Sequence, residues 1–153
     1  MMKKDKKRKG KGRVWIVLLV IFGVIVIGMG VTMIALEPGR REALNLTIGV
    51  VDFKKLHDGT FIGDYKGTKD HLRDAEVKVT VSSGAVTDIQ VIGGSLANEK
   101  QTAGIRDGKS IHDLLDQVIQ SQSLQVDAIS GATITSKVHL KAVETALDKA
   151  QSK

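Results

Sequence analysis

The chain has 153 residues, enough for one domain of ordinary size once its unusual N-terminal segment is set aside. Residues 1–13 carry eight basic residues and one acidic residue, a net charge of +7. The other 15 basic and 16 acidic residues leave the rest of the chain at −1, so the overall charge of +6 does not indicate a nucleic-acid-binding domain. The absence of cysteine excludes disulfides, thiolate metal sites and thiol catalysis.

An uncharged apolar segment of 23 residues, Val14–Leu36, follows the basic tail. As a helix it would be about 35 Å long, which is enough to cross a hydrocarbon core of about 30 Å. The segment exceeds the apolar part of a cleaved signal peptide, which is about 7–15 residues long. We therefore predict an uncleaved transmembrane anchor over residues 14–36, a helix break at Pro38-Gly39 and a linker over residues 37–49.

The charges on the two sides of this segment predict its orientation. Eight basic residues precede it, whereas only Arg40 and Arg41 follow it closely. The positive-inside rule then places the tail of residues 1–13 in the cytoplasm, against anionic lipid, and residues 37–153 outside it. The sequence thus predicts a single-pass protein of the cell membrane.

Residues 50–153 are predicted to form one α+β domain, beginning with an antiparallel sheet. A short strand is expected within Asp58–Tyr65, where two glycines bracket apolar residues. Val77, Val79 and Val81 alternate with polar residues, and after the turn at Ser83-Gly84 a second alternating run continues to Ile92. This pattern predicts a β-hairpin with one buried face.

Two helices are expected after the hairpin. Ser110 can cap a helix whose apolar residues have helical spacing: Ile111, Leu114, Leu115, Val118 and Ile119. A last helix is predicted from about Lys137 to Gln151, with Leu140, Val143 and Leu147 on one side. The predicted fold is therefore an N-terminal transmembrane helix followed by a small α+β domain with an antiparallel sheet and two or more helices.

The sequence offers no pattern typical of a metal site or of a self-sufficient enzyme. The histidines lack carboxylate or cysteine partners at ligand spacing and are each predicted to be a surface or helix-face residue: His57, His71, His112 and His139. No phosphate-binding Walker loop, dinucleotide fingerprint or nucleophile elbow is present. The few aromatic residues outside the anchor, Phe53, Phe61 and Tyr65, are expected to fill the core.

A cluster of hydroxyl residues lies directly before the last predicted helix, within Asp127–Ser136. Gly131 in this cluster permits a left-handed turn, and the first turn of a helix offers unpaired N–H groups that can bind a phosphate. The alternative is a strand-to-helix turn with Ser136 as the N-cap and no ligand. The residues themselves leave both interpretations open.

The order of residues in this segment resembles a known motif. Asp127-x-x-Ser-Gly-Ala-Thr, followed by Thr135-Ser136 and a helix, resembles the flavinylation motif of the FMN-binding domain family. This family includes the flavin-carrying C subunit of sodium-pumping NADH:quinone reductase and the G subunit of the Rnf complex. Upstream, Asp58–Gly63 and Val77–Ile92 resemble the first segment and central hairpin of that domain, whereas Glu99–Gly104 matches the family's Glu-Thr-Pro-Gly-like loop only loosely.

The resemblance implies a cofactor and the residues that hold it. In that family the phosphate of FMN is esterified to the last threonine of the motif, here Thr133, by a magnesium-dependent flavin transferase that uses FAD and releases AMP. The implied cofactor-binding residues are Ser130, Gly131, Ala132, Thr133, Thr135 and Ser136. Asp127 is implied either to be recognised by the transferase or to form the turn, and the resemblance implies no metal site on the chain itself.

Two functions follow from the resemblance and the predicted anchor. The first is a membrane-anchored, extracytoplasmic electron carrier that passes electrons between redox partner proteins and is not a complete enzyme, because the sequence has no evident acid–base pair. The alternative is a membrane-tethered redox sensor or assembly module whose flavin does not turn over as a carrier. Neither function involves nucleic acid.

The charge asymmetry makes a prediction about topology. Protease added to intact protoplasts or spheroplasts should degrade residues 44–153, because the positive-inside rule places them outside the cytoplasm. Immunoblotting against the C-terminus measures the loss, with a cytoplasmic protein as the control for intact cells. Protection of the domain until the cells are lysed would show the opposite orientation.

Overall fold

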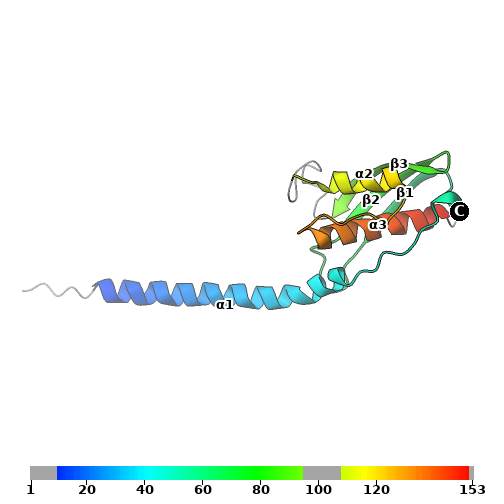
Figure 1. The fold of residues 1–153 in the computed structure, drawn as a ribbon. Coiled ribbons are helices and arrows are strands. Elements are labelled where there is room, and N and C mark those ends of the chain that lie inside the picture. Colours follow the sequence, from blue (N-terminus) through cyan, green and yellow to red (C-terminus); the bar gives the residue numbers. More distant parts are fainter. Residues whose placement is uncertain (1–9, 95–107, 152–153) are drawn as a thin grey trace, which may run out of the picture. The chain divides into compact units, whose positions relative to one another are not determined.

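The computed structural model describes residues 10–94 and 108–151, and the chain divides into two units, residues 1–37 and 38–153. The first unit consists, in its described part, of helix α1, which runs from Gly10 to Leu44 and continues into the second unit. The second unit contains a sheet and two further helices, and it is described by itself below (Figure 1).

The apolar part of α1 has the composition of a membrane-crossing helix. Its large apolar side chains between Val14 and Ile34 are each at least 50% exposed, and they surround the helix on all sides. The hydroxyl of Thr32 donates to the carbonyls of Gly28 and Met29, so this polar group is satisfied within the helix. The helix is long and apolar enough to span a membrane.

The predicted helix break at Pro38-Gly39 is wrong, because α1 continues through Pro38 to Leu44. Proline removes one helical hydrogen bond, so other contacts must hold the following turn. The Glu42 carboxylate accepts hydrogen bonds from the backbone N–H groups of Thr68 and Lys69 at 3.0–3.2 Å. Ala43 is fully buried in the core of the second unit, so tertiary contacts keep these residues helical.

The sheet has three antiparallel strands in the order β1-β2-β3: Gly59–Tyr65, Ala75–Ser82 and Ala85–Gly94. The predicted hairpin is confirmed as β2 and β3, in which Val79 lies opposite Ile89. On its other edge β2 pairs with β1, where Phe61 lies opposite Val79. The turn of the hairpin is held by Asp58, whose carboxylate accepts hydrogen bonds from the N–H groups of Ser83 and Gly84 at 2.9 and 2.8 Å. The Gly84 and Ser83 bonds lower the pKa of Asp58, since they favour its charged form.

Helix α2, Ile111–Ser121, is capped by Ser110, as the sequence predicts, and the structure adds Asp113 as the second residue of a capping box. The backbone N–H of Ser110 donates to the Asp113 carboxylate at 2.6 Å, and the Asp113 N–H donates to the Ser110 hydroxyl. At the other end, the left-handed residue Gln122 forms two hydrogen bonds with the backbone of Val86 in β3. The helix is thereby attached to one edge of the sheet.

Helices α2 and α3 cover one face of the sheet, and α3 extends from Thr133 to Gln151 (Figure 1). The core lies between this face and the two helices, and it includes Phe61 and Tyr65, while Phe53 is partly buried beside it. A short 3-10 turn, Phe53–Lys55, precedes β1. This arrangement confirms the predicted α+β fold.

The closest approach between α3 and the sheet is at Gly63 in β1. A Cβ atom at this position would collide with the backbone of α3 at Ala142 and Ala146. Both alanines are fully buried, and their small side chains allow the helix to rest directly on the strand. Position 63 therefore requires glycine because there is no room for a Cβ atom, and not because the backbone has an unusual conformation.

We predict that Gly63→Ala lowers the free energy of unfolding by about 1–3 kcal/mol, because the added methyl group must push α3 away from β1. Chemical denaturation of the purified protein measures this change. The matched control is Ile62→Thr on the exposed face of the same strand, which should change stability by less than about 0.5 kcal/mol. Equal effects of the two substitutions would show that the contact at Gly63 is not tight.

Candidate functional site

The hydroxyl-rich segment forms a turn that leads into α3 earlier than the sequence predicts. Helix α3 begins at Thr133, not at Lys137, and Ser136 lies inside the first turn rather than capping it. The backbone N–H of Ala132 donates to the carbonyl of Ile129, and the N–H of Ser136 donates to the carbonyl of Ala132, both at 2.9 Å. Burial of Ala132 and Ile129 in the core fixes this earlier start.

Ser136 holds the turn in place. Its side chain is fully buried, its hydroxyl accepts a hydrogen bond from the N–H of Ile129 at 3.0 Å, and it donates to the carbonyl of Ala132 at 3.0 Å. The hydroxyl is thus engaged on both sides by the backbone of the same turn. Its role in this structure is to hold the loop against the first turn of α3.

Gly131 has the left-handed backbone conformation that its sequence position suggested, with φ of 73°. A side chain would strain this conformation, because L-residues other than Asn and Asp rarely adopt it. Ser130 and Gly131 are both exposed. The turn therefore places two small, exposed residues close to Thr133, the exposed first residue of the helix, with the buried Ala132 between them.

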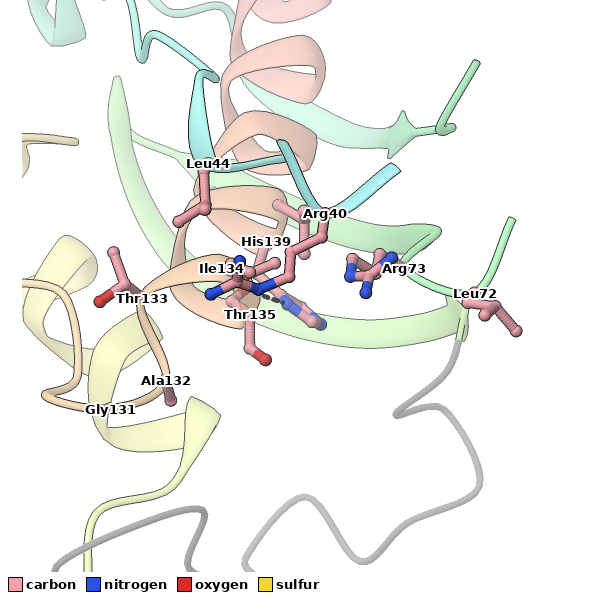
Figure 2. Close-up of a pocket in the computed structure, with 11 residues that line it drawn as sticks. Arg40, Leu44, Leu72, Arg73, Gly131, Ala132, Thr133, Ile134, Thr135 and His139 are labelled. Atoms are coloured by element: carbon pink, nitrogen blue, oxygen red, sulfur yellow. Dashed lines mark hydrogen bonds between the residues drawn. The ribbon is translucent and has the colours of Figure 1, made fainter. Parts of the chain in front are cut away.

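A cleft of about 490 Å³ opens beside this turn, within the size range of small-molecule sites. It combines the end of α1, the segment before β2 and the start of α3 (Figure 2). The residues that line it are Arg40, Leu44, Leu72, Arg73, Gly131, Ala132, Thr133, Ile134, Thr135, Val138 and His139. Of the six motif residues, Gly131, Ala132, Thr133 and Thr135 reach this cleft, whereas Ser130 and Ser136 do not line it.

Two arginines give the cleft positive charge. Arg40 comes from the last turns of α1, and Arg73 precedes β2 and forms an ion pair with Asp70 at 3.1 Å. Guanidinium groups bind phosphate oxygens with several N–H donors, and the N-terminus of α3 adds a partial positive charge. The cleft therefore suits an anionic ligand.

These arginines were not predicted as site residues. In the sequence, Arg40 is recognisable only as a charge next to the apolar segment, and Arg73 belongs to no motif. Neither residue has a local pattern that connects it to the motif, because both reach the cleft only through tertiary folding.

His139 also lines the cleft, although it was predicted only to be a surface or helix-face residue and not a site residue. The side chain is 1% exposed, and its Nδ1 lies 2.8 Å from the carbonyl oxygen of Thr135. Burial lowers the pKa of His139, because the charged imidazolium would lose its hydration. The four-residue spacing from Thr135 to His139 would have indicated a shared helix face, had the helix been predicted to begin at Thr133.

Other predicted features lie away from the cleft. Asp127 is exposed in the loop between α2 and α3, where another protein can reach it. The loop Glu99–Gly104 lies outside the described residues. His57, His71 and His112 are exposed. The prediction that the histidines lack carboxylate partners is wrong for two of them, since His71 lies 3.1 Å from Asp74 and His112 lies 2.9 Å from Asp116.

The sequence was compared with models of known protein families. The FMN-binding domain matches residues 72–148, just over half of the chain. The chain belongs to the FMN-binding domain family. The matched region contains Arg73, the turn and α3 up to Asp148, so it includes most of the residues that line the cleft.

A solved structure has a similar fold. The crystal structure of the CPE2226 protein from Clostridium perfringens is 24% identical to this chain, with a TM-score of 0.50. The match covers 63% of this chain and 90% of that protein, and at this identity it supports the fold alone. A search of curated proteins found no significant match.

The residues around the cleft fit the cofactor of the family, FMN. The N-terminus of α3 and the two arginines suit its phosphate, the hydroxyls of Thr133 and Thr135 are at the cleft, and apolar side chains of Leu44 and Ile134 can contact its ring system. His139 adds a buried ring nitrogen, Nε2, that has no hydrogen-bond partner among the described residues. We therefore describe the cleft as the candidate FMN site of this flavin-binding protein.

Ser136→Ala is expected to lower the free energy of unfolding by about 1–3 kcal/mol, because it leaves the buried N–H of Ile129 without its acceptor. Denaturation of the cofactor-free protein measures this effect. The control is Ser130→Ala in the same turn, where the exposed side chain should contribute less than about 0.5 kcal/mol. If the two substitutions cost the same, Ser136 does not hold the turn.

Proposed function

We propose that this protein is a membrane-anchored, extracytoplasmic electron carrier whose FMN is attached covalently to Thr133. The observation that carries the proposal is the position of Thr133, which is the exposed first residue of α3 and lines a cleft with Arg40 and Arg73. FMN supplies the redox chemistry when it is bound, and the chain supplies its position and surroundings.

The attachment reaction that we propose forms one bond and breaks one. The Thr133 oxygen attacks the phosphorus of the FMN half of FAD, the pyrophosphate bond breaks, and AMP leaves. The hydroxyl proton passes to a base of the flavin transferase, which also brings the magnesium ion. Exposure of Thr133 and its neighbours Ser130 and Gly131 supports access by this enzyme, and the exposed Asp127 is available for its recognition.

The resulting phosphodiester keeps a negative charge at the start of α3. The dipole of the helix favours such a charge by about 0.3–1 kcal/mol, and the guanidinium groups of Arg40 and Arg73 add to this attraction. These contacts position the phosphate. The covalent bond retains the flavin, which suits a domain that lies outside the cytoplasm and its supply of free FMN.

The anchor and the orientation are part of the same proposal. An apolar helix that exposes large side chains on all sides is poorly suited to water, and a lipid bilayer is the environment in which it is stable. The basic residues before Val14 favour a cytoplasmic N-terminus. Electrons would then pass between membrane and extracytoplasmic redox proteins through the flavin of this domain.

Labelling of Thr133 variants tests the attachment. Co-expressed with a flavin transferase, the wild-type chain should keep flavin fluorescence on a denaturing gel, and its mass should rise by one FMN less one water. Thr133→Ala should lose both signals, because it lacks the attacking oxygen, whereas Thr133→Ser should keep them at least in part. Reduction with dithionite should bleach the flavin absorbance, and an electron acceptor should restore it.

The matched control is Thr135→Ala, which removes a neighbouring hydroxyl at the same cleft and should leave the label in place. Fluorescence that persists in Thr133→Ala would place the ester elsewhere in the hydroxyl cluster. A wild-type chain that is never labelled but binds free FMN would overturn covalent attachment and leave only non-covalent binding.

A further inference from the structure

One ring nitrogen of His139 forms a hydrogen bond, and the other forms none with the described residues. A backbone carbonyl only accepts, so Nδ1, at 2.8 Å from the Thr135 carbonyl oxygen, must carry the hydrogen. The other nitrogen, Nε2, is buried and has no partner, and it is the one such side-chain nitrogen or oxygen in the part of the chain that the structure describes. Buried polar groups in folded proteins are nearly always paired, so this atom requires an explanation.

The chemistry of Nε2 follows from this tautomer. Burial disfavours the imidazolium form and lowers the pKa of His139, an effect that outweighs the opposing hydrogen bond to the Thr135 carbonyl. The neutral ring with its hydrogen on Nδ1 has a lone pair on Nε2, which can only accept a hydrogen bond. A partner for this atom must therefore provide an N–H or O–H group.

The position of the ring shows where such a partner can come from. His139 lines the cleft together with Thr133 and Thr135, one to two turns along the same helix (Figure 2). From Thr133 to His139, α3 rises by about 9 Å. A ligand attached at Thr133 and extending into the cleft thus passes beside this imidazole.

We propose that Nε2 of His139 accepts a hydrogen bond from the FMN held in this cleft. The donor is an N–H group of the isoalloxazine ring or a hydroxyl of the ribityl chain, the two kinds of donor that the cofactor offers. Nε2 is closed to solvent in the structure, so side chains that line the cleft must shift when the flavin enters, as rotamers commonly do on binding. The inference rests on the proposed function, because it uses the FMN that Thr133 would hold.

Nitrogen-15 NMR of the histidine side chains tests the contact directly. The full chain, in detergent micelles and with labelled histidine, is compared before and after loading by the flavin transferase. The Nε2 signal of His139, identified by its absence in His139→Leu, should move in the direction of an acceptor that has gained a hydrogen bond.

Two other histidines serve as internal controls. His57, which precedes β1, lies beside the C-terminal end of α3, and its backbone N–H donates to the carbonyl of Ala150. His112 on α2 already has a hydrogen-bond partner, Asp116. Their signals should stay in place on loading. A loaded protein in which the His139 signal is also unchanged would overturn the inference.

Thermal unfolding gives a second readout that a purely structural histidine would not produce. His139→Leu removes the unpartnered acceptor and also the Nδ1 hydrogen bond to Thr135, so the Tm of the cofactor-free variant is the reference against which the effect of loading is measured. Loading with flavin should raise the Tm by several degrees less in His139→Leu than in the wild type. His139→Gln, which keeps an acceptor oxygen, should recover part of the difference. An equal fall in Tm with and without flavin would show that His139 only fills the core.

The same variants distinguish the two kinds of donor. A bond to the ring changes the environment of the redox-active group, so His139→Leu should then shift the midpoint potential and the visible absorption of the flavin. A bond to a ribityl hydroxyl should leave both in place while the Tm difference persists. Either result supports the inference.

Failure of this inference and failure of covalent attachment give different results. In-gel fluorescence of the wild type reports attachment alone. If the wild type is labelled and the His139 signal does not move, the contact is absent and attachment at Thr133 stands. If the wild type is not labelled, titration with free FMN reads the same Nε2 signal, where a shift supports the contact and no shift overturns it.

Discussion

The direct contact between α3 and β1 at Gly63 is the constraint on which the candidate site depends. Without a side chain at that position, the backbone of the strand meets the backbone of the helix at Ala142 and Ala146, and this fixes where α3 lies on the sheet. A helix is stiff over a few turns, so fixing its middle also fixes its first turn. Ser136 then ties the preceding turn to the helix through Ile129 and Ala132. The position of Thr133 is the consequence of these two contacts.

The segment between the apolar helix and the sheet takes part in the same structure. The ammonium group of Lys137 on α3 donates to the carbonyls of Leu44 and Leu46 at 2.6 and 3.2 Å, and Lys141 forms an ion pair with Glu144. The Glu144 carboxylate in turn accepts a hydrogen bond from the N–H of Gly49. The charged side chains of α3 thus hold residues 44–49 against the helix. Through these contacts the last turns of α1 can contribute Arg40 and Leu44 to the cleft, although they lie outside the region that matches the FMN-binding domain.

Some polar groups at the site form hydrogen bonds with the backbone, and others are available to a ligand. The Ser136 hydroxyl and Nδ1 of His139 are bonded to backbone within the turn and the helix. Thr133 is exposed, and Nε2 of His139 has no partner in residues 10–94 and 108–151. The helix dipole contributes less than about 1 kcal/mol, which is less than a tenfold change in a binding constant, so it cannot by itself hold a cofactor against dilution. A covalent bond at Thr133 would make retention independent of such small terms and leave the cleft to set the surroundings of the flavin.

The sequence by itself determined the features that depend on neighbouring residues. The alternating valines predicted the hairpin, Ser110 predicted the start of α2, and the uncharged segment Val14–Leu36 predicted the apolar helix, because each pattern reflects a local periodicity or a local cap. The motif Ser-Gly-Ala-Thr pointed to the FMN-binding family. Tertiary structure alone decided that α1 continues past Pro38, that α3 begins at Thr133, and that Arg40, Arg73 and His139 meet at one cleft. Those outcomes depend on burial and on hydrogen bonds between segments up to a hundred residues apart, and no local pattern carries that information.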